Sequence, residues 1–177
     1  MLDIAQQTLE FYTKYLKTPT LEDLKITDTS LLEKQWCVFV TIYKNGEVRW
    51  WAGNIKELQE NLALEIIENT IEAISKDSRF SPVKLDEVEK IKIRVDIITS
   101  RTILKEKEIL SIDPIKNGVL AIKNDYNTMG IILPNITPLL LTWEDFIPVL
   151  KEKMKLKEFK EKDFILYRIS TDMWNNF

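Results

Sequence analysis

The sequence predicts an α+β protein of two similar lobes, each made of two strands, a helix and a third strand. Three observations support this fold class. Residues 36–54 and 118–134 each contain two β-rich segments around a short turn, a helical pattern follows each pair, and an apolar segment closes each half. Because strands joined by short turns pair antiparallel, we expect mostly antiparallel sheets flanked by helices. The repeated order is consistent with an internal duplication.

The first lobe is predicted over about residues 36–99, after an N-terminal amphipathic helix over 3–18. Its strands WCVFVTIY and EVRWWAG flank Asn-Gly at 45–46, which favours a tight hairpin because both residues tolerate positive φ angles. Apolar residues recur at helical spacing over 57–76. The segment IKIRVDIIT (91–99) is typical of a strand and closes the lobe.

The second lobe is predicted over about residues 117–171. GVLAIKN and TMGIILP form its hairpin around a turn at 125–127, and a helix follows over about 142–156. The segment FILYRIS (164–170) supplies the closing strand. Residues 100–116 link the lobes and contain alternating lysines and glutamates, a pattern typical of a solvated segment.

Composition is that of an ordinary globular protein. A chain of 177 residues with 45% hydrophobic and 30% charged residues fits a single domain, 1–177, with a full core. The net charge of −3 creates no overall attraction to nucleic acid or to acidic membranes. The N-terminus lacks the basic start and apolar run of a signal peptide, and no uninterrupted stretch of about 18 apolar residues is present. We therefore expect a cytoplasmic protein.

The residue types that are missing exclude most catalytic sites. The chain has no histidine, which removes Ser-His-Asp and Cys-His arrangements and the commonest metal ligand. A lone cysteine, Cys37, permits neither an intramolecular disulfide nor a multi-thiolate metal site. With four glycines and no G-x-G-x-x-G or G-x-x-x-x-G-K-[ST] motif, the chain cannot build a glycine-rich phosphate site. We predict no catalytic residue, no metal and no cofactor.

The segment GEVRWWAG contains two adjacent tryptophans whose placement depends on strand register. A regular hairpin with a two-residue turn pairs Trp51 with Val40 and puts both on the face that carries Val38. We therefore expect the Trp51 indole to be largely buried between these valines and a helix, with Trp50 on the other face. A bulge near Gly53 would change the register and with it the side on which Cys37 lies relative to Trp51.

The same register places Cys37 on the face opposite Trp51. Because no histidine is available to deprotonate it, we interpret Cys37 as an inert, packed thiol. The simplest interpretation of Trp50 and Trp51 is that both fill volume. The alternative is a stacking site for a base or another flat ligand, which requires an exposed ring.

Arg49 and the loop DSRFSP (77–82) supply the candidate charged groups. An arginine in an apolar strand must reach solvent or be paired, because an isolated buried charge costs about several kcal/mol. Arg49 therefore lies at an exposed end of the strand, pairs with a carboxylate such as Asp77, or binds an anionic ligand. Asp77 and Arg79 form either a loop-stabilising ion pair or part of an anion site. Gly53 permits a close backbone approach or a bulge.

Three stretches of the sequence match the motifs of one family in the family's order. They are FVTIYKNGEVRWWAGNI, DSRFSP, and GVLAIKNDYNTMGIILPNI followed by TWEDFIPVLKEKMKL. Together they resemble the AMMECR family from about Phe39 to Tyr167, and the loop motif D-x-R-F-x-P is matched completely. The family's R-G-C-I-G motif is here Arg49-Trp50-Trp51-Ala52-Gly53, with Trp51 in place of the cysteine. Any activity that needs this thiol therefore does not carry over.

The resemblance implies a two-lobed α+β fold with a cleft and no settled biochemical activity. Prokaryotic members often occur with a MEMO-like protein and a radical-SAM protein in the AmmeMemoRadiSam system, so these are the expected partners. We expect a binding or regulatory module without catalysis of its own. The alternatives are an enzyme or enzyme subunit acting on a small anionic substrate and, least favoured, a single-stranded nucleic-acid binding protein. The expected cleft residues are Arg49, Trp51, Gly53, Asp77, Arg79 and Asn135.

Overall fold

The computed structural model describes residues 1–77 and 80–177 and confirms the predicted α+β class. The chain divides into two compact units, the first formed by residues 1–97 and 173–177 and the second by residues 98–172. The strands are β1 (Val38–Lys44), β2 (Glu47–Gly53), β3 (Ile91–Ile103), β4 (Gly118–Lys123), β5 (Met129–Ile132) and β6 (Phe164–Asn175).

The strands form one hydrogen-bonded sheet in the order β2-β1-β3-β6-β4-β5, whereas the sequence predicted separate sheets. Antiparallel pairing joins β1 to β2 and β3, and it joins β4 to β5 and β6. Each half keeps the predicted order of strand, strand, helix and strand. The similarity of the two lobes in three dimensions stays a prediction.

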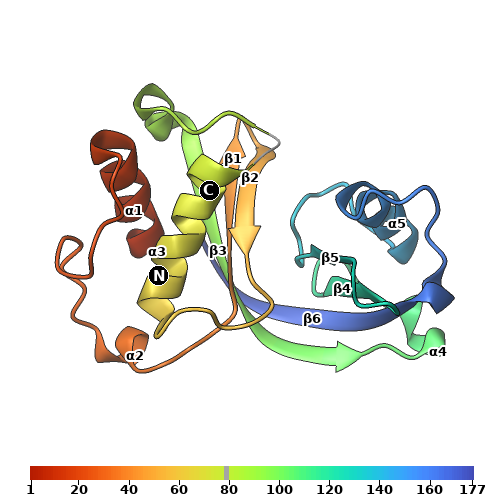
Figure 1. Ribbon diagram of the computed structural model, residues 1–177. Coiled ribbons are helices and arrows are strands. Elements are labelled where there is room, and N and C mark those ends of the chain that lie inside the picture. The colour runs from red at the N-terminus through yellow and green to blue at the C-terminus, as the bar shows by residue number, and fades with distance from the viewer. Residues whose placement is uncertain (78–79) are drawn as a thin grey trace. The chain divides into compact units, whose positions relative to one another are not determined.

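Helices lie against one face of the strands in the first unit (Figure 1). The helices on this face are α1 (Leu2–Tyr15) and α3 (Leu62–Ile71), which continues into a π-helical turn (Glu72–Lys76). The unit also contains α2 (Thr29–Leu32), which contacts α3, and a 3₁₀ helix (Leu85–Lys90), which contacts α1. Alternate valines and isoleucines of β1 and β3 pack on the apolar sides of α1 and α3 to form the core. Core residues include Ile4, Leu9, Val38, Val40, Ile42, Ile66, Ile67, Ile93 and Val95.

Local backbone chemistry explains where the predicted helices begin and end. The helix expected over 3–18 ends earlier because Leu16 takes a left-handed conformation with φ 53°. The helix expected over 57–76 begins late, at Leu62, because the Asn61 side chain accepts a hydrogen bond of 3.0 Å from the Leu64 N–H. Residues 57–61, which were expected to be helical, therefore form a loop before α3.

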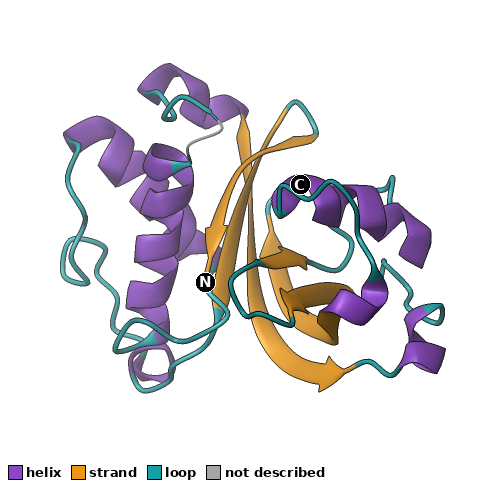
Figure 2. Cartoon of the chain, turned by 45° about the vertical axis from the view of Figure 1, so that its right-hand side comes forward, coloured by secondary structure: helices purple, strands orange, loops and turns teal. Residues whose placement is uncertain are grey.

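The second unit is built around α5 (Trp143–Lys153), which packs next to β4 and β5 (Figures 1 and 2). The segment expected to be a solvated linker is structured: it contains the end of β3 and α4 (Glu106–Ile109). A short 3₁₀ helix (Glu161–Asp163) precedes β6. The core includes Leu104, Ile109, Ile112, Val119, Ile132, Trp143, Phe146, Leu150 and Leu166. Among the described residues, every helix is too short or too polar to cross a membrane.

A β-bulge at Arg49 changes the register of the β1–β2 hairpin. Lys44 pairs with Glu47 as expected and Tyr43 pairs with Val48, but Ile42 then pairs with Trp50, so Arg49 is an extra residue in β2. Because one extra residue reverses the alternation of side chains, every later residue of β2 faces the side opposite to the predicted one.

The prediction that Trp51 lies in the core was therefore wrong. Trp50 occupies that place, 2% exposed, with Val38, Val40 and Ile42 in the core of the first unit. Trp51 pairs with Thr41 on the other face and is half-buried. The bulge that the sequence allowed near Gly53 occurs four residues earlier, at the point where β2 leaves the turn.

Gly53 is required by a close approach to an aromatic ring on the neighbouring strand. It pairs with Phe39, and a Cβ atom added to Gly53 would lie 2.2 Å from the Phe39 Cδ1 atom. Phe39 is buried, so its ring cannot move away without disturbing its neighbours. The expectation of a close approach at Gly53 is thus confirmed, with a side chain rather than a backbone as the neighbour.

Gly53→Ala is expected to lower the free energy of unfolding by about 1–3 kcal/mol, the usual cost of overpacking. Urea denaturation followed by tryptophan fluorescence measures this change. In a Phe39→Leu background the same substitution should cost less, because the ring that the new methyl group meets is absent. Equal costs in the two backgrounds would contradict the steric explanation.

Candidate functional site

Arg49 projects from the bulge and stacks on the aromatic side chain of the D-x-R-F-x-P loop. Its guanidinium carbon lies 4.2 Å from the ring centroid of Phe80 and 5.4 Å from that of Trp50, both within the range of cation–π contacts. Arg49 is exposed. Of the three placements allowed by the sequence, the exposed one is observed: Arg49 is the extra residue of the bulge, and its side chain lies over the Phe80 ring and is exposed to solvent.

The loop that carries Phe80 is held against Trp50. The indole Nε1 donates a hydrogen bond of 3.0 Å to the Ser81 carbonyl, and the Phe80 and Trp50 rings meet edge to face at 6.1 Å. The buried Trp50 side chain therefore holds Phe80 in position. Phe80 in turn provides the ring on which the Arg49 guanidinium stacks.

Asp77 lies beside β2 and accepts a hydrogen bond of 3.3 Å from the Trp51 backbone N–H. Because β2 is an edge strand, this N–H would otherwise be available to an added strand. The carboxylate thus occupies one edge position. Within the described part of the chain Arg49 makes ring contacts and no ion pair, so it does not form the pair with Asp77 considered from the sequence.

The predicted site residues are only partly brought together. Arg49, Trp51 and Asp77 lie around β2 in the first unit. Arg79 lies outside the described residues. Asn135 belongs to the second unit, where it has φ 46° and its N–H donates a hydrogen bond of 2.8 Å to the Pro114 carbonyl. Its observed contact holds the chain after β5.

The predicted separation of Cys37 from Trp51 was wrong, because the bulge brings Trp51 to the face of β1 that carries Phe39 and Thr41. Cys37 precedes Phe39, and with the bulge both share the face of Trp51. The thiol is buried and donates a hydrogen bond of 3.3 Å to the Glu57 carboxylate. Its burial and its hydrogen bond agree with the interpretation of Cys37 as a packed thiol.

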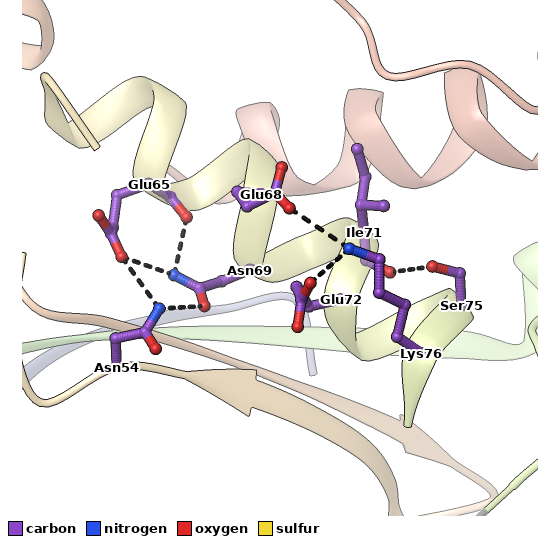
Figure 3. A network of polar contacts seen from close by, with 8 residues as sticks. All are labelled: Asn54, Glu65, Glu68, Asn69, Ile71, Glu72, Ser75 and Lys76. Carbon is purple, nitrogen blue, oxygen red and sulfur yellow. Dashed lines mark hydrogen bonds and ion pairs between the residues drawn. The ribbon is translucent and has the colours of Figure 1, made fainter. Parts of the chain in front are cut away.

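A buried carboxylate, Glu65, organises the loop between β2 and α3, and sequence reasoning missed it (Figure 3). One oxygen accepts hydrogen bonds from the side-chain amides of Asn54 at 3.3 Å and Asn69 at 3.1 Å. The other accepts from the backbone N–H groups of Leu58 at 2.9 Å and Gln59 at 2.8 Å. Four donors thus compensate a carboxylate that is 1% exposed.

The sequence around Glu65 indicates that this residue lies near the buried side of α3. It lies directly before the apolar pair Ile66-Ile67 and four residues before Asn69, so it shares a helix side with a second polar residue. By contrast, Glu68 and Glu72 pair with Lys76 on a solvent-accessible part of the helix (Figure 3). The same residue type therefore has two different structural roles on α3.

A second buried polar group lies on β3. The Arg94 and Asp96 side chains form two hydrogen bonds, Nε to Oδ2 at 2.6 Å and Nη2 to Oδ1 at 2.7 Å, with the pair almost completely buried. Tyr43 also interacts with Arg94, and burial raises the pKa of its hydroxyl, which therefore stays protonated at neutral pH. The alternating charges in IKIRVDIIT were the available signal for this pair.

The polar side chains described above fall into two classes, those that are buried and hydrogen-bonded within the protein and one that is exposed to solvent. Glu65, Arg94 and Asp96 are buried and hydrogen-bonded inside the first unit. Arg49 is accessible to solvent and keeps its donors available within the described part of the chain. No group of three or more acidic or cysteine side chains in that part is placed to hold a metal ion. The geometry supports binding of an anion at Arg49 better than proton transfer.

Glu65→Gln is expected to lower the free energy of unfolding by about 1–3 kcal/mol. Each carboxylate oxygen of Glu65 accepts two hydrogen bonds, so the NH₂ group of a glutamine would face two other donors in either orientation of its amide. Hydrogen exchange should accelerate at the Leu58 and Gln59 amides. Glu68→Gln on the same helix is the matched control, and it should change stability by less than about 0.5 kcal/mol because its ion pair is exposed. Unchanged exchange in Glu65→Gln would show that the carboxylate does not hold this loop.

Asp96→Leu is expected to cost about 3–5 kcal/mol of unfolding free energy, because it leaves the Arg94 guanidinium buried without its bidentate partner. The double variant Arg94→Met with Asp96→Leu should recover most of this loss, since it removes both charges. Chemical denaturation of the two variants measures the difference. A double variant as unstable as the single one would mean that packing, not the unpaired charge, causes the loss.

Comparison with known proteins gives a consistent result along the chain. The AMMECR1 family model matches residues 2–174. A Thermotoga maritima protein is 31% identical over 171 residues, covering 96% of this chain and 94% of that protein. A Methanosarcina barkeri protein is 28% identical over 138 residues, covering 76% and 67%. The crystal structure of the uncharacterised protein PH0010 from Pyrococcus horikoshii has a TM-score of 0.79 at 22% identity, covering 98% of this chain and 88% of that one. This structure shares the fold.

Proposed function

The chain belongs to the AMMECR1 family, as its motifs predicted, and from this premise we propose that it is a non-catalytic binding or regulatory module. The observation that carries the proposal is the exposed Arg49 guanidinium, stacked on Phe80 at 4.2 Å. A cation held in this way is positioned before any ligand arrives, which lowers the entropic cost of binding. Arg49 is therefore the proposed contact of the module.

The state of the other ionisable groups supports binding over catalysis. A general acid or base must reach the reacting atoms of a substrate. The buried carboxylates Glu65 and Asp96 instead accept hydrogen bonds from protein donors, and the thiol of Cys37 is directed at Glu57. With Trp51 at the position of the family's motif cysteine, the hairpin also lacks the thiol of that motif.

The proposed partners are a MEMO-like protein and a radical-SAM protein encoded in the same genome. This part of the proposal rests on the family resemblance, in which such proteins occur together. The structure contributes the contact to be tested, because Arg49 is exposed and its replacement removes no core packing.

Arg49→Ala is expected to weaken the complex with one of these purified partners at least tenfold, a loss of about 1.4 kcal/mol, because it removes the cation and its hydrogen-bond donors. Arg49→Lys should retain part of the affinity, since it keeps the charge but loses the planar fork of donors. Native mass spectrometry and titration calorimetry measure complex formation.

Arg101→Ala is the matched control, an exposed arginine of the second unit, and it should bind the partner like the unaltered protein. Full affinity in Arg49→Ala would contradict the proposed contact. A small molecule that co-purifies with the protein, is lost in Arg49→Ala and is turned over on incubation would instead support the enzyme alternative.

A further inference from the structure

We propose that the Arg49 site recognises the carboxylate of an aspartate or glutamate side chain on a partner polypeptide. This inference rests on the proposed function and names the chemistry of the group that is bound. It follows from the geometry of the Arg49 stack, from the charges around β2 and from the way in which the edge of β2 is occupied.

The stack leaves the guanidinium donors available for a planar anion. Phe80 attracts Arg49 through its π electrons and takes none of the five N–H groups in a conventional hydrogen bond. Those groups form a flat fork that matches the two oxygens of a carboxylate. No described residue accepts a hydrogen bond from them. The stack on Phe80 thus orients the Arg49 guanidinium and leaves its N–H donors available to a ligand.

The surrounding charges favour a singly charged carboxylate over a phosphate. Glu47 is exposed on the same strand, and the Asp77 carboxylate lies at the Trp51 N–H, two residues beyond Arg49. The nearby cation Lys44 is already paired with Glu87. A phosphate carries a charge of about −1.5 to −2 at neutral pH and gains from several cationic donors. In the described part of the first unit, Arg49 alone offers unengaged donors at this strand.

The magnitude of such a contact indicates that the carboxylate belongs to a polypeptide. An exposed arginine–carboxylate pair contributes about 0–1 kcal/mol, so a free carboxylate such as acetate would bind only weakly. Useful affinity requires additional contacts on either side of the charge. The Phe80 ring, which lies beside the guanidinium and is partly exposed, and the exposed Val48 next to Arg49 in β2 provide apolar surface for neighbouring residues of a bound chain.

The edge of β2 argues against recognition of that polypeptide by strand addition. A strand added to β2 would need the Trp51 N–H, which already donates to Asp77. Recognition through a side-chain carboxylate leaves this hydrogen bond intact. The inferred ligand is therefore an acidic segment that places one carboxylate at Arg49 and apolar side chains beside it.

Fluorescence anisotropy with a labelled peptide tests this inference, using glutamates that alternate with serine and leucine and a matched peptide with glutamine in place of glutamate. The glutamate peptide should bind about two- to fivefold more tightly than the glutamine peptide, as expected for an exposed ion pair, and Arg49→Ala should remove this preference. Arg101→Ala should leave it unchanged. Added salt should weaken binding because the pair is exposed. Circular dichroism shows that each variant is folded.

Competition with inorganic phosphate and with acetate separates the possible anions. Phosphate should displace the peptide no better than acetate at equal concentration and ionic strength. Stronger displacement by phosphate, or equal binding of the two peptides, overturns the inference. If a partner complex depends on Arg49 while the glutamate peptide does not bind, the inference fails and the proposed function stands. If neither depends on Arg49, both fail.

Discussion

The β-bulge at Arg49 is the constraint on which the candidate site depends. By adding one residue to β2, it sends Trp50 into the core, places Trp51 on the opposite face and leaves Arg49 exposed over the Phe80 ring. Without the bulge, Arg49 would share a face with Val38 and Val40, where an unpaired cation costs several kcal/mol. The bulge therefore resolves a conflict between an apolar strand and a charged residue within it.

The core then supports the exposed cation through a short series of contacts. Trp50 is buried among the valines of β1, its indole nitrogen holds the Ser81 carbonyl, and its ring meets Phe80, which carries Arg49. Along this series the side chains become more exposed, from the buried Trp50 through the partly exposed Phe80 to the exposed Arg49. The position of Arg49 is thus determined by packing that begins in the hydrophobic core, although Arg49 itself contributes little to the stability of that core.

Sequence reasoning predicted the elements well and the placement of individual side chains less well. Periodicity and the Asn-Gly turn identified the hairpin and helices, because these signals are local. The predicted register was wrong from Arg49 onward. A bulge depends on how side chains pack on both faces of the sheet, and the alternation of residue types along a strand does not reveal this packing. Glu65 and the Arg94–Asp96 pair were missed for a similar reason: burial of a charge depends on donors supplied by distant segments, such as Asn54 and the Leu58–Gln59 backbone for Glu65.

The two motif positions that this chain shares with the R-G-C-I-G pattern have different physical explanations. Gly53 is explained by structure, because a Cβ atom there would meet the Phe39 ring. Arg49 has no comparable structural requirement, since it is exposed and its contacts with Phe80 and Trp50 are of a kind worth about 0.5–1 kcal/mol at accessible sites. A small residue at the bulge would lose these ring contacts and no core packing. The proposed binding of a ligand by its donors would supply a physical reason for an arginine at this position.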